Sequence, residues 1–320
     1  MNLKSIVSRL KNVLYPVDLA VFHEFMPSPY GGGNQFMKAL CSWISRQGYR
    51  IEMNRLTLNT KACLYNSFNF NYNYLKFRKR ESCTMVHRVD GPIASYRGYD
   101  DGTDSMILKY NNELADRTIF QSDYSYKKHI DLGYTFVEPS VIMNAVNSDI
   151  FNPNGRVAKI GDVKIKIISA SWSTNENKGF QTYKWLGENL DPSRYEYTFV
   201  GRTPYKLPGV VCLEACASED LAVVLKQHHI YLSASENDPC SNSLIEALSC
   251  GLPAIYLKSG GHPEIVKNAG LGFDDKEEIP KILEELIQNY SNYQKDIFVE
   301  NMNEIGQKYL QILGLSHTDF

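Results

Sequence analysis

The chain has 320 residues, of which 43% are hydrophobic and 22% charged, a composition typical of globular proteins and not of disordered or fibrous ones. A formal net charge of −2, from 34 Lys and Arg against 36 Asp and Glu, argues against a broad nucleic-acid-binding surface and so against nucleic acid as a partner. Seven cysteines, an odd number without a Cys-x-x-Cys pair, indicate reduced thiols in a cytoplasmic protein rather than disulfides or a zinc site.

The first fourteen residues have a pattern of their own. Residues 1–14 (MNLKSIVSRLKNVL) place apolar side chains at helical spacing and basic side chains outside that stripe, which predicts a basic amphipathic helix. Two interpretations stay open: the helix packs on the core of its domain, or it makes a peripheral contact with the anionic inner face of a membrane. No apolar run is long enough for a spanning helix, and no signal peptide is recognised.

In the first half of the chain, short apolar runs alternate with helical patterns. Strands are predicted at 18–25, 50–54, 83–89, 118–121 and 140–143, and helices at 34–47 and 124–132. A glycine-rich loop, 27–33 (PSPYGGG), separates the first strand from the first helix. Residues 65–80 have no clear periodicity and stay unassigned. The polar stretch with Arg97, Asp100, Asp101 and Asp104 is interpreted as a solvated loop.

The second half alternates more regularly. Strands are predicted at 163–169, 195–200, 230–233 and 254–257, and helices at 180–189, 219–227, 243–249, 262–268 and from 276 onward. Such alternation predicts an α/β protein with two Rossmann-like domains, covering 1–155 and 156–320, that face a cleft in which the site would lie. Residues 151–158 (FNPNGRVA) would link the domains, and the last helix is free to pack back on the first.

Three acids follow one another where strands end and helices begin. Asp238 lies just past the strand 230–233, Glu246 one turn into the next helix, and Glu264 at the start of the helix after that. Ligands bind at the carboxyl ends of parallel strands, and the free amides of Ser241, Asn242 and Ser243 at a helix start favour a phosphate. The alternative is structural, because Ser243 and Glu246 also have the spacing of a capping box.

These residues carry a resemblance to a known family. Asp238-x7-Glu246, the stretch 247–253 (ALSCGLP) and Gly260-Gly261-x-x-Glu264 resemble the signature of the retaining GT-B glycosyltransferases, a family that includes sucrose synthases and bacterial mannosyltransferases. The resemblance implies that Glu246 binds the ribose of a nucleotide sugar and that Gly261 and Glu264 belong to the donor site. Asp238 stands where the family usually has Glu and would contact the transferred sugar.

Weaker motifs agree with this resemblance. Residues 141–151 (VIMNAVNSDIF), with Asn144, are similar to the segment that closes the first domain of the family, and Gly31, Gly32 and Gly33 look like its glycine-rich loop. Residues 169–179 (SASWSTNENKG) resemble its G-R-x(4–5)-K-G diphosphate loop. Lys178 matches the lysine, whereas Ser173 stands about where the arginine is expected.

The first domain should bind the acceptor. Residues 87–91 (HRVDG) end a strand where the family usually carries a functional histidine, and strand alternation puts His87 and Arg88 on opposite faces. Whether His87 or Asp90 is catalytic depends on where the strand ends; Arg88 and Asn144 are the candidate acceptor-binding residues. The structural alternative is a core histidine at 87 and a local ion pair between Arg88 and Asp90. The chain has no Asp-x-Asp motif, so we expect no metal site and no cofactor other than the donor substrate.

The predicted function is hexosyltransferase-type transfer from a nucleoside diphosphate sugar to a glycan or lipid-linked acceptor, and the resemblance implies retention of configuration. Lys178 and Asp238, with His87 or Asp90, are the predicted catalytic residues. The resemblance implies a role in surface polysaccharide or glycoconjugate synthesis. The alternative is a non-catalytic subunit of the same fold that binds a nucleotide sugar or a glycan.

Overall fold

The chain forms two compact units, each built from more than one stretch of sequence. The computed structural model describes residues 17–27, 31–161 and 163–316. The first unit comprises Met1–Phe25, Met37–Met143 and Met302–Phe320, and the second Met26–Phe36 and Asn144–Asn301. The division after Met143 lies twelve residues before the expected boundary at 155, and the last helix belongs to the first unit. Residues 1–14, with the predicted amphipathic helix, lie outside the described residues.

A parallel sheet forms the centre of the first unit. In the described residues its six strands have the order β2-β1-β3-β4-β5-β6. They are β1 (Leu19–Phe22), β2 (Ile51–Met53), β3 (Ala62–Asn66), β4 (Thr84–Val89), β5 (Arg117–Phe120) and β6 (Pro139–Val141). All pairings are parallel, so the carboxyl ends of the strands meet at one edge of the sheet.

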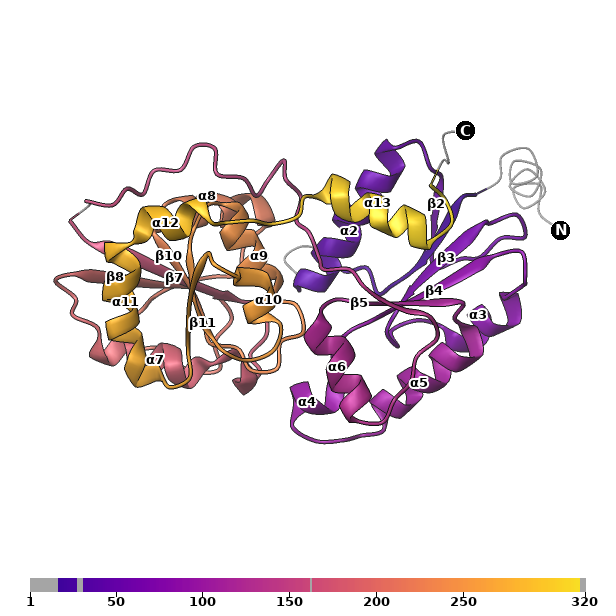
Figure 1. The fold of residues 1–320 in the computed structure, drawn as a ribbon, viewed down its shortest axis with the longest axis horizontal. Coiled ribbons are helices and arrows are strands. Elements are labelled where there is room, and N and C mark those ends of the chain that lie inside the picture. The colour runs from indigo at the N-terminus through magenta and orange to yellow at the C-terminus, as the bar shows by residue number, and fades with distance from the viewer. Residues whose placement is uncertain (1–16, 28–30, 162, 317–320) are drawn as a thin grey trace. The chain divides into compact units, whose positions relative to one another are not determined.

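Helices flank this sheet (Figure 1). They are α2 (Gly32–Arg46), which begins in the second unit, α3 (Tyr72–Arg78), α4 (Ile93–Arg97), α5 (Thr103–Leu114), α6 (Asp123–Asp131) and α13 (Met302–Ile312). The core beneath them includes Ala20 and Phe22 of β1 and Tyr65 of β3. Because the central strands are covered on both faces, they read as continuous apolar runs.

The second unit repeats this architecture. Among the described residues its sheet has the order β12-β11-β10-β7-β8-β9, again parallel throughout. The strands are β7 (Ile165–Ser171), β8 (Tyr195–Gly201), β9 (Val211–Leu213), β10 (Ile230–Ser233), β11 (Ala254–Leu257) and β12 (Gly270–Phe273). The helices are η1 (Glu176–Lys178), α7 (Phe180–Asn189), α8 (Ser218–Lys226), α9 (Asn242–Ser249), α10 (His262–Val266), η2 (Lys276–Glu278), α11 (Ile279–Gln288) and α12 (Tyr290–Lys295).

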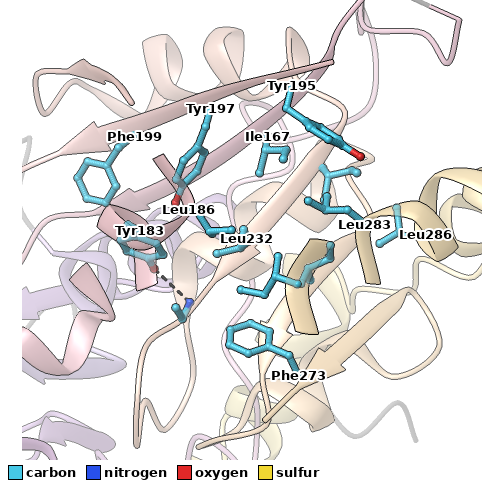
Figure 2. Packing of buried hydrophobic residues seen from close by; sticks show 14 of the residues in the cluster. Ile167, Tyr183, Leu186, Tyr195, Tyr197, Phe199, Leu232, Phe273, Leu283 and Leu286 are labelled. Carbon is cyan, nitrogen blue, oxygen red and sulfur yellow. Dashed lines mark hydrogen bonds between the residues drawn. The ribbon is translucent and has the colours of Figure 1, made fainter. Parts of the chain in front are cut away.

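One hydrophobic cluster joins the second sheet to the helices on one of its faces. Ile167 and Leu232 of the sheet pack with Leu186 of α7 and Leu283 of α11 (Figure 2). Tyr183 adds a polar contact, because its hydroxyl accepts a hydrogen bond of 3.1 Å from the backbone N of Ala234. This bond fixes the chain just past β10, which is where the site begins.

The predicted fold class is confirmed, and most elements lie where they were expected. Predicted β10, β11 and α7 coincide with the observed bounds. The unassigned stretch 65–80 holds the end of β3 and α3, and β9 and β12 were not predicted. The stretch with Asp104 is not a solvated loop: Asp104 is buried and accepts hydrogen bonds from the N atoms of Ile93 (2.7 Å) and Ala94 (2.9 Å).

Within the described residues, every helix is too short or too polar to cross a lipid bilayer.

The helix α13 returns to the first unit and docks on α2 (Figure 1). Trp43 donates from its indole Nε1 to Asn303 Oδ1 at 2.5 Å, and Arg117 Nη1 donates to the carbonyl O of Ile312 at 2.6 Å. Gly306 lies against the Trp43 ring, where an added Cβ would come within 2.3 Å of a ring carbon. A side chain larger than hydrogen therefore has no space at this contact.

We predict that Gly306→Ala lowers the free energy of unfolding by about 1–3 kcal/mol, because overpacking against Trp43 outweighs the gain in helix propensity of about 1 kcal/mol. Thermal and urea unfolding would measure the change. The control is Gln307→Ala, at the next position of α13, where the side chain is exposed. A Gly306→Ala protein as stable as wild type would contradict this packing.

Candidate functional site

Three loops of the second unit leave the same edge of its sheet. They follow β7, β10 and β11, which are neighbours in the sheet. The first ends in η1 and carries Lys178, the second carries Asp238 and leads into α9, and the third contains Gly260 and Gly261. Parallel pairing thus brings residues sixty and more positions apart to one place.

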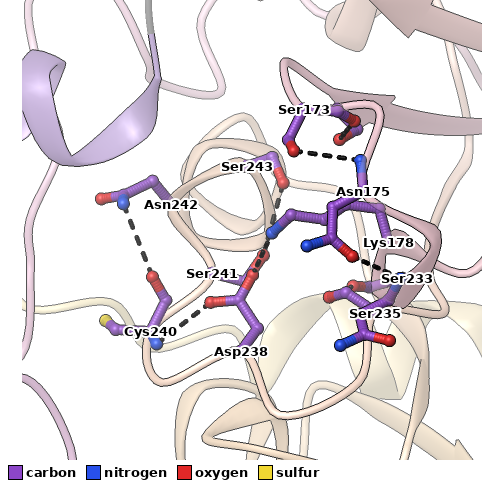
Figure 3. Close-up of polar contacts among 12 residues, drawn as sticks. Ser173, Asn175, Lys178, Ser233, Ser235, Asp238, Cys240, Ser241, Asn242 and Ser243 are labelled. Carbon is purple, nitrogen blue, oxygen red and sulfur yellow. Dashed lines mark hydrogen bonds and ion pairs between the residues drawn. The ribbon is translucent and has the colours of Figure 1, made fainter. Parts of the chain in front are cut away.

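An ion pair joins the first two loops. Lys178 Nζ donates to Asp238 Oδ2 at 2.8 Å, and both side chains are mostly buried (Figure 3). Burial alone would raise the pKa of Asp238, but Lys178, together with His262 and the backbone N of Cys240, brings this pKa below its ordinary value. Asp238 is therefore ionised at neutral pH, and it already compensates the charge of Lys178.

The start of α9 differs from the capping-box alternative. The helix begins at Asn242 with Ser241 as its N-cap residue, so Ser243 is the second residue of the helix. No side chain caps this helix end; the Ser241 hydroxyl lies 3.3 Å from that of Ser243 instead. The backbone N–H groups of the first turn, which have no partner within the helix, are thus not satisfied by a side-chain cap. Such a helix start can bind an anion.

Glu246 is the least satisfied acid of this region. Glu246 is 7% exposed, and among the described residues its carboxyl group has no hydrogen-bond or ion-pair partner. Burial raises the pKa of Glu246 to about 8. A buried carboxyl group without a partner is costly, and a ligand hydroxyl that hydrogen-bonds to it would remove that cost.

The glycine-rich loop belongs to the second unit, and so does Asn144. Asn144 Nδ2 donates to Asn242 Oδ1 at 3.1 Å, and a Cβ added to Gly32 would lie 2.4 Å from the Cβ of Asn242. A Cβ on Gly31 would lie 3.8 Å from Trp172, and one on Gly33 would meet nothing. Asn144 was predicted on the acceptor side; the structure groups it with the residues expected to bind the donor.

The Gly-Gly turn supports the Asp238 loop. Gly260 has φ +65°, and a Cβ there would lie 2.2 Å from the carbonyl O of Asp238. The N atom of Gly261 donates to the same carbonyl O at 2.9 Å. Gly261 is buried and makes this contact within the chain, and its place in the donor site stays a prediction. Glu264 is half-buried in the first turn of α10.

His262 was not singled out from the sequence, and it links the chain just past β10 to the end of β11. Its Nδ1 donates to the carbonyl O of Leu257 at 3.0 Å. Its Nε2 then accepts from the hydroxyls of Ser233 and Ser235, both at 3.1 Å. A neutral histidine therefore joins the ends of β10 and β11. Its only signal in the sequence was its place in the Gly-Gly-His-Pro turn.

In the first unit, His87, one of the two alternatives for a catalytic residue, lies in the core. His87 is fully buried and stacks on Tyr65, with ring centroids 4.4 Å apart. Its Nε2 donates to the carbonyl O of Ser67 at 2.8 Å, and its Nδ1 accepts from Asn111 at 3.2 Å. Burial lowers the pKa of His87 to about 3. Because both ring nitrogens are engaged, this histidine is a core residue.

The next residues lie at the carboxyl end of β4. Arg88 is buried, so its predicted contact with an acceptor is not available; its Nη1 donates to Asn66 Oδ1 at 2.6 Å and to Asp90 Oδ1 at 3.2 Å. Asp90 lies just past the strand with its side chain 34% exposed, and it also accepts from Gln121. Of the three candidates in this segment, Asp90 alone reaches the surface.

His23, one residue past β1, was missed. It is 9% exposed, and neither ring nitrogen has a hydrogen-bond partner among the described residues. Burial and the nearby charge of Arg88 lower the pKa of His23 to about 4, so its ring is neutral. The sequence placed His23 within the predicted strand 18–25, and no motif around it indicated that the strand ends at Phe22.

The second unit also carries the match to a known family. Residues 185–289 match the family of glycosyl transferases group 1. The sulfoquinovosyl transferase SQD2 of Arabidopsis thaliana is 23% identical over 176 residues, which cover 50% of this chain and 34% of that protein. The match thus spans about a third of the curated relative.

Solved structures share the fold over more than nine tenths of the chain. The sucrose-phosphate synthase of Thermosynechococcus elongatus superposes with a TM-score of 0.72 at 15% identity, over 94% of this chain and all of that one. HepE of Anabaena, in complex with UDP and glucose, gives a TM-score of 0.68 at 14% identity, over 93% of this chain and 99% of that one. The architecture is therefore the GT-B fold of glycosyltransferases. Together with the family match, it supports a glycosyltransferase.

The buried carboxyl group gives a pH-dependent prediction. The pKa of Glu246 rises from an ordinary value of 4.5 to about 8 on folding, so the folded protein holds this proton more tightly than the unfolded chain. The contribution of Glu246 to stability therefore falls as the pH rises from about 4.5 to about 8. We expect Glu246→Gln to remove this loss, so that its stability relative to wild type increases through this window and levels off above it.

Thermal unfolding at pH values from 5 to 9, each about one unit apart, would measure the difference. The control is Glu236→Gln, an exposed acid on the loop before Asp238. A constant difference between Glu246→Gln and wild type across the range would mean that the carboxyl group is solvated in the folded protein.

Proposed function

We propose that the protein transfers a sugar from a nucleoside diphosphate sugar to an acceptor hydroxyl, with retention of configuration. The observation that carries the proposal is Glu246: a buried carboxyl group without a partner among the described residues, one turn into the uncapped helix that follows the Asp238 loop. The family match over 185–289 includes Asp238 and Glu246, and the structural neighbour HepE was solved with UDP and glucose. Both support a nucleotide sugar as the donor.

Each residue then has a role. Glu246 would hydrogen-bond to the ribose diol, whose hydroxyls can both donate and accept. The diphosphate would lie at the start of α9, near the N–H groups of Asn242 and Ser243, with Lys178 beside it. Asp238 would face the transferred sugar, and Gly31 and Gly32 would let backbone approach the phosphates.

The proposed reaction takes place on one face of the sugar. The acceptor hydroxyl forms a bond to the anomeric carbon while the bond from that carbon to the diphosphate oxygen breaks. The hydroxyl proton passes to the leaving diphosphate, whose developing charge is stabilised by Lys178 and the helix amides. The acceptor is proposed to be a glycan or lipid-linked sugar of a surface polysaccharide or glycoconjugate. Asp90, half-buried at the carboxyl end of β4, is the acid of the first unit that we propose to contact it.

A second candidate is a non-catalytic subunit that binds a nucleotide sugar or glycan. Two observations favour it: Lys178 is neutralised by Asp238, and Ser173 stands about where the related diphosphate loop has an arginine. Release of free nucleoside diphosphate from a panel of UDP-, GDP- and ADP-sugars separates the two, because only an enzyme turns the donor over.

The roles of the two acids are distinguishable by calorimetric titration. We expect Glu246→Ala to weaken binding of the free nucleoside diphosphate about ten- to hundredfold, the effect of losing a hydrogen bond to a buried group. Asp238→Asn should keep the wild-type affinity, because it leaves Lys178 free for the phosphates, and should lose turnover. The control is Glu236→Gln. Equal affinities in all four proteins would return Glu246 to a structural role.

Turnover should not depend on a divalent metal. The chain lacks Asp-x-Asp, and within the described residues no three His, Cys, Asp or Glu side chains gather in a group that could hold a metal ion. We therefore expect donor turnover to be unchanged in excess EDTA. A loss that Mg²⁺ or Mn²⁺ restores would contradict a reaction in which Lys178 and the helix amides alone meet the diphosphate charge.

A further inference from the structure

The loops after β7 and β8 leave the second sheet side by side. These strands pair in parallel, with Ser171 opposite Gly201, so Trp172 and Arg202 are the first residues beyond the pair. The backbone N of Arg202 donates to the carbonyl O of Ser171 at 3.0 Å, which extends the pairing by one residue. Arg202 is therefore positioned by the sheet, although it follows the strand.

The Arg202 guanidinium lies over the Trp172 ring. Its Cζ is 3.8 Å from the ring centroid, a cation–π contact that orients the guanidinium while its N–H donors stay available. The side chain is exposed and pairs with no carboxylate of the described residues. Trp172 also lies near the glycine-rich loop, since a Cβ on Gly31 would be 3.8 Å from its ring.

The charge of the proposed diphosphate site is not balanced without a further cation. Lys178 is compensated by Asp238, and Glu246 carries no positive charge in any state. A nucleoside diphosphate brings at least two negative charges, and its departure in the reaction adds to the charge on the β-phosphate. Helix amides offer partial charges only.

The position of Arg202 agrees with this need. A spacing of four or five residues before Lys178 places the missing arginine of the related loop at Ser173 or Trp172. The guanidinium of Arg202 lies over the Trp172 ring, so the neighbouring strand supplies a positive charge beside one of these two positions. Tyr205, three residues further on, hydrogen-bonds to Glu176 of η1 at 3.4 Å and holds the two loops together.

We propose that Arg202 binds the donor diphosphate in place of the arginine that the Lys178 loop lacks. This inference rests on the proposed function and deepens it, because it names the residue that supplies the second positive charge. Guanidinium can bind two phosphate oxygens at once, which an ammonium group cannot, and its stack on Trp172 reduces the entropy lost on binding.

The test compares binding of a nucleoside diphosphate with binding of its nucleoside. The probes are whichever of UDP, GDP and ADP stabilises the wild type most, and uridine, guanosine or adenosine to match. We expect Arg202→Gln to weaken the diphosphate about tenfold or more and to leave the nucleoside unchanged. Arg202→Lys should lie between wild type and Arg202→Gln. The control is Lys206→Gln, an exposed lysine of the same loop, which should bind like wild type.

A double variant tests whether an arginine at position 173 can replace Arg202. Adding Ser173→Arg to Arg202→Gln should restore diphosphate affinity, because the guanidinium then comes from the Lys178 loop itself. Wild-type affinity in Arg202→Gln, or equal losses for diphosphate and nucleoside, would overturn the assignment of Arg202 and leave the proposed function standing. A wild type that binds none of the three diphosphates would overturn both.

Discussion

The parallel order of the second sheet is the constraint on which the candidate site depends. Because β7, β10 and β11 are neighbours and run in one direction, the loops that carry Lys178, Asp238 and Gly260 leave the same edge. Asp238 and Lys178 are sixty residues apart in sequence, yet an ion pair of 2.8 Å joins them. The Gly-Gly turn and His262 then hold the Asp238 loop from the other side, so no part of the site depends on one loop alone.

The C-terminal half of the site could be predicted in detail because its signals are local. The strand ends, the helix start at 242 and the acids at 238 and 246 are read from turn residues and apolar runs within thirty positions. The contact that was missed, between Arg202 and Trp172, depends on tertiary structure. Arg202 is separated from the loop it contacts by a helix and a strand, and only the pairing of β7 with β8 brings it to Trp172.

The N-terminal half was harder to predict, for a related reason. β3 is a short, fully buried strand that runs into an aromatic and Asn-rich stretch, so neither alternation nor helical spacing identifies it. Without β3, the faces of β4 could not be assigned. His87 turned out to stack on Tyr65 of that strand, and Asp90, one residue past the end of β4, is the group that reaches the surface. The position of the strand end therefore decides between the two: His87 lies within β4 and belongs to the core, whereas Asp90 lies past the end of β4 and stays a candidate.

Burial, the ion pair and hydrogen bonds together set the charge states of the groups in the site, and these states suit the proposed nucleotide sugar. The ring of His262 is neutral and fully hydrogen-bonded, so it supports the loop without adding charge. Lys178 and Asp238 are both ionised but compensate one another. Glu246, protonated below about pH 8, can donate as well as accept, which suits a diol. No described residue hydrogen-bonds to its carboxyl group, and native structures rarely keep such a group buried without a purpose. The unfavourable burial of Glu246 is therefore best explained by a ligand that satisfies it.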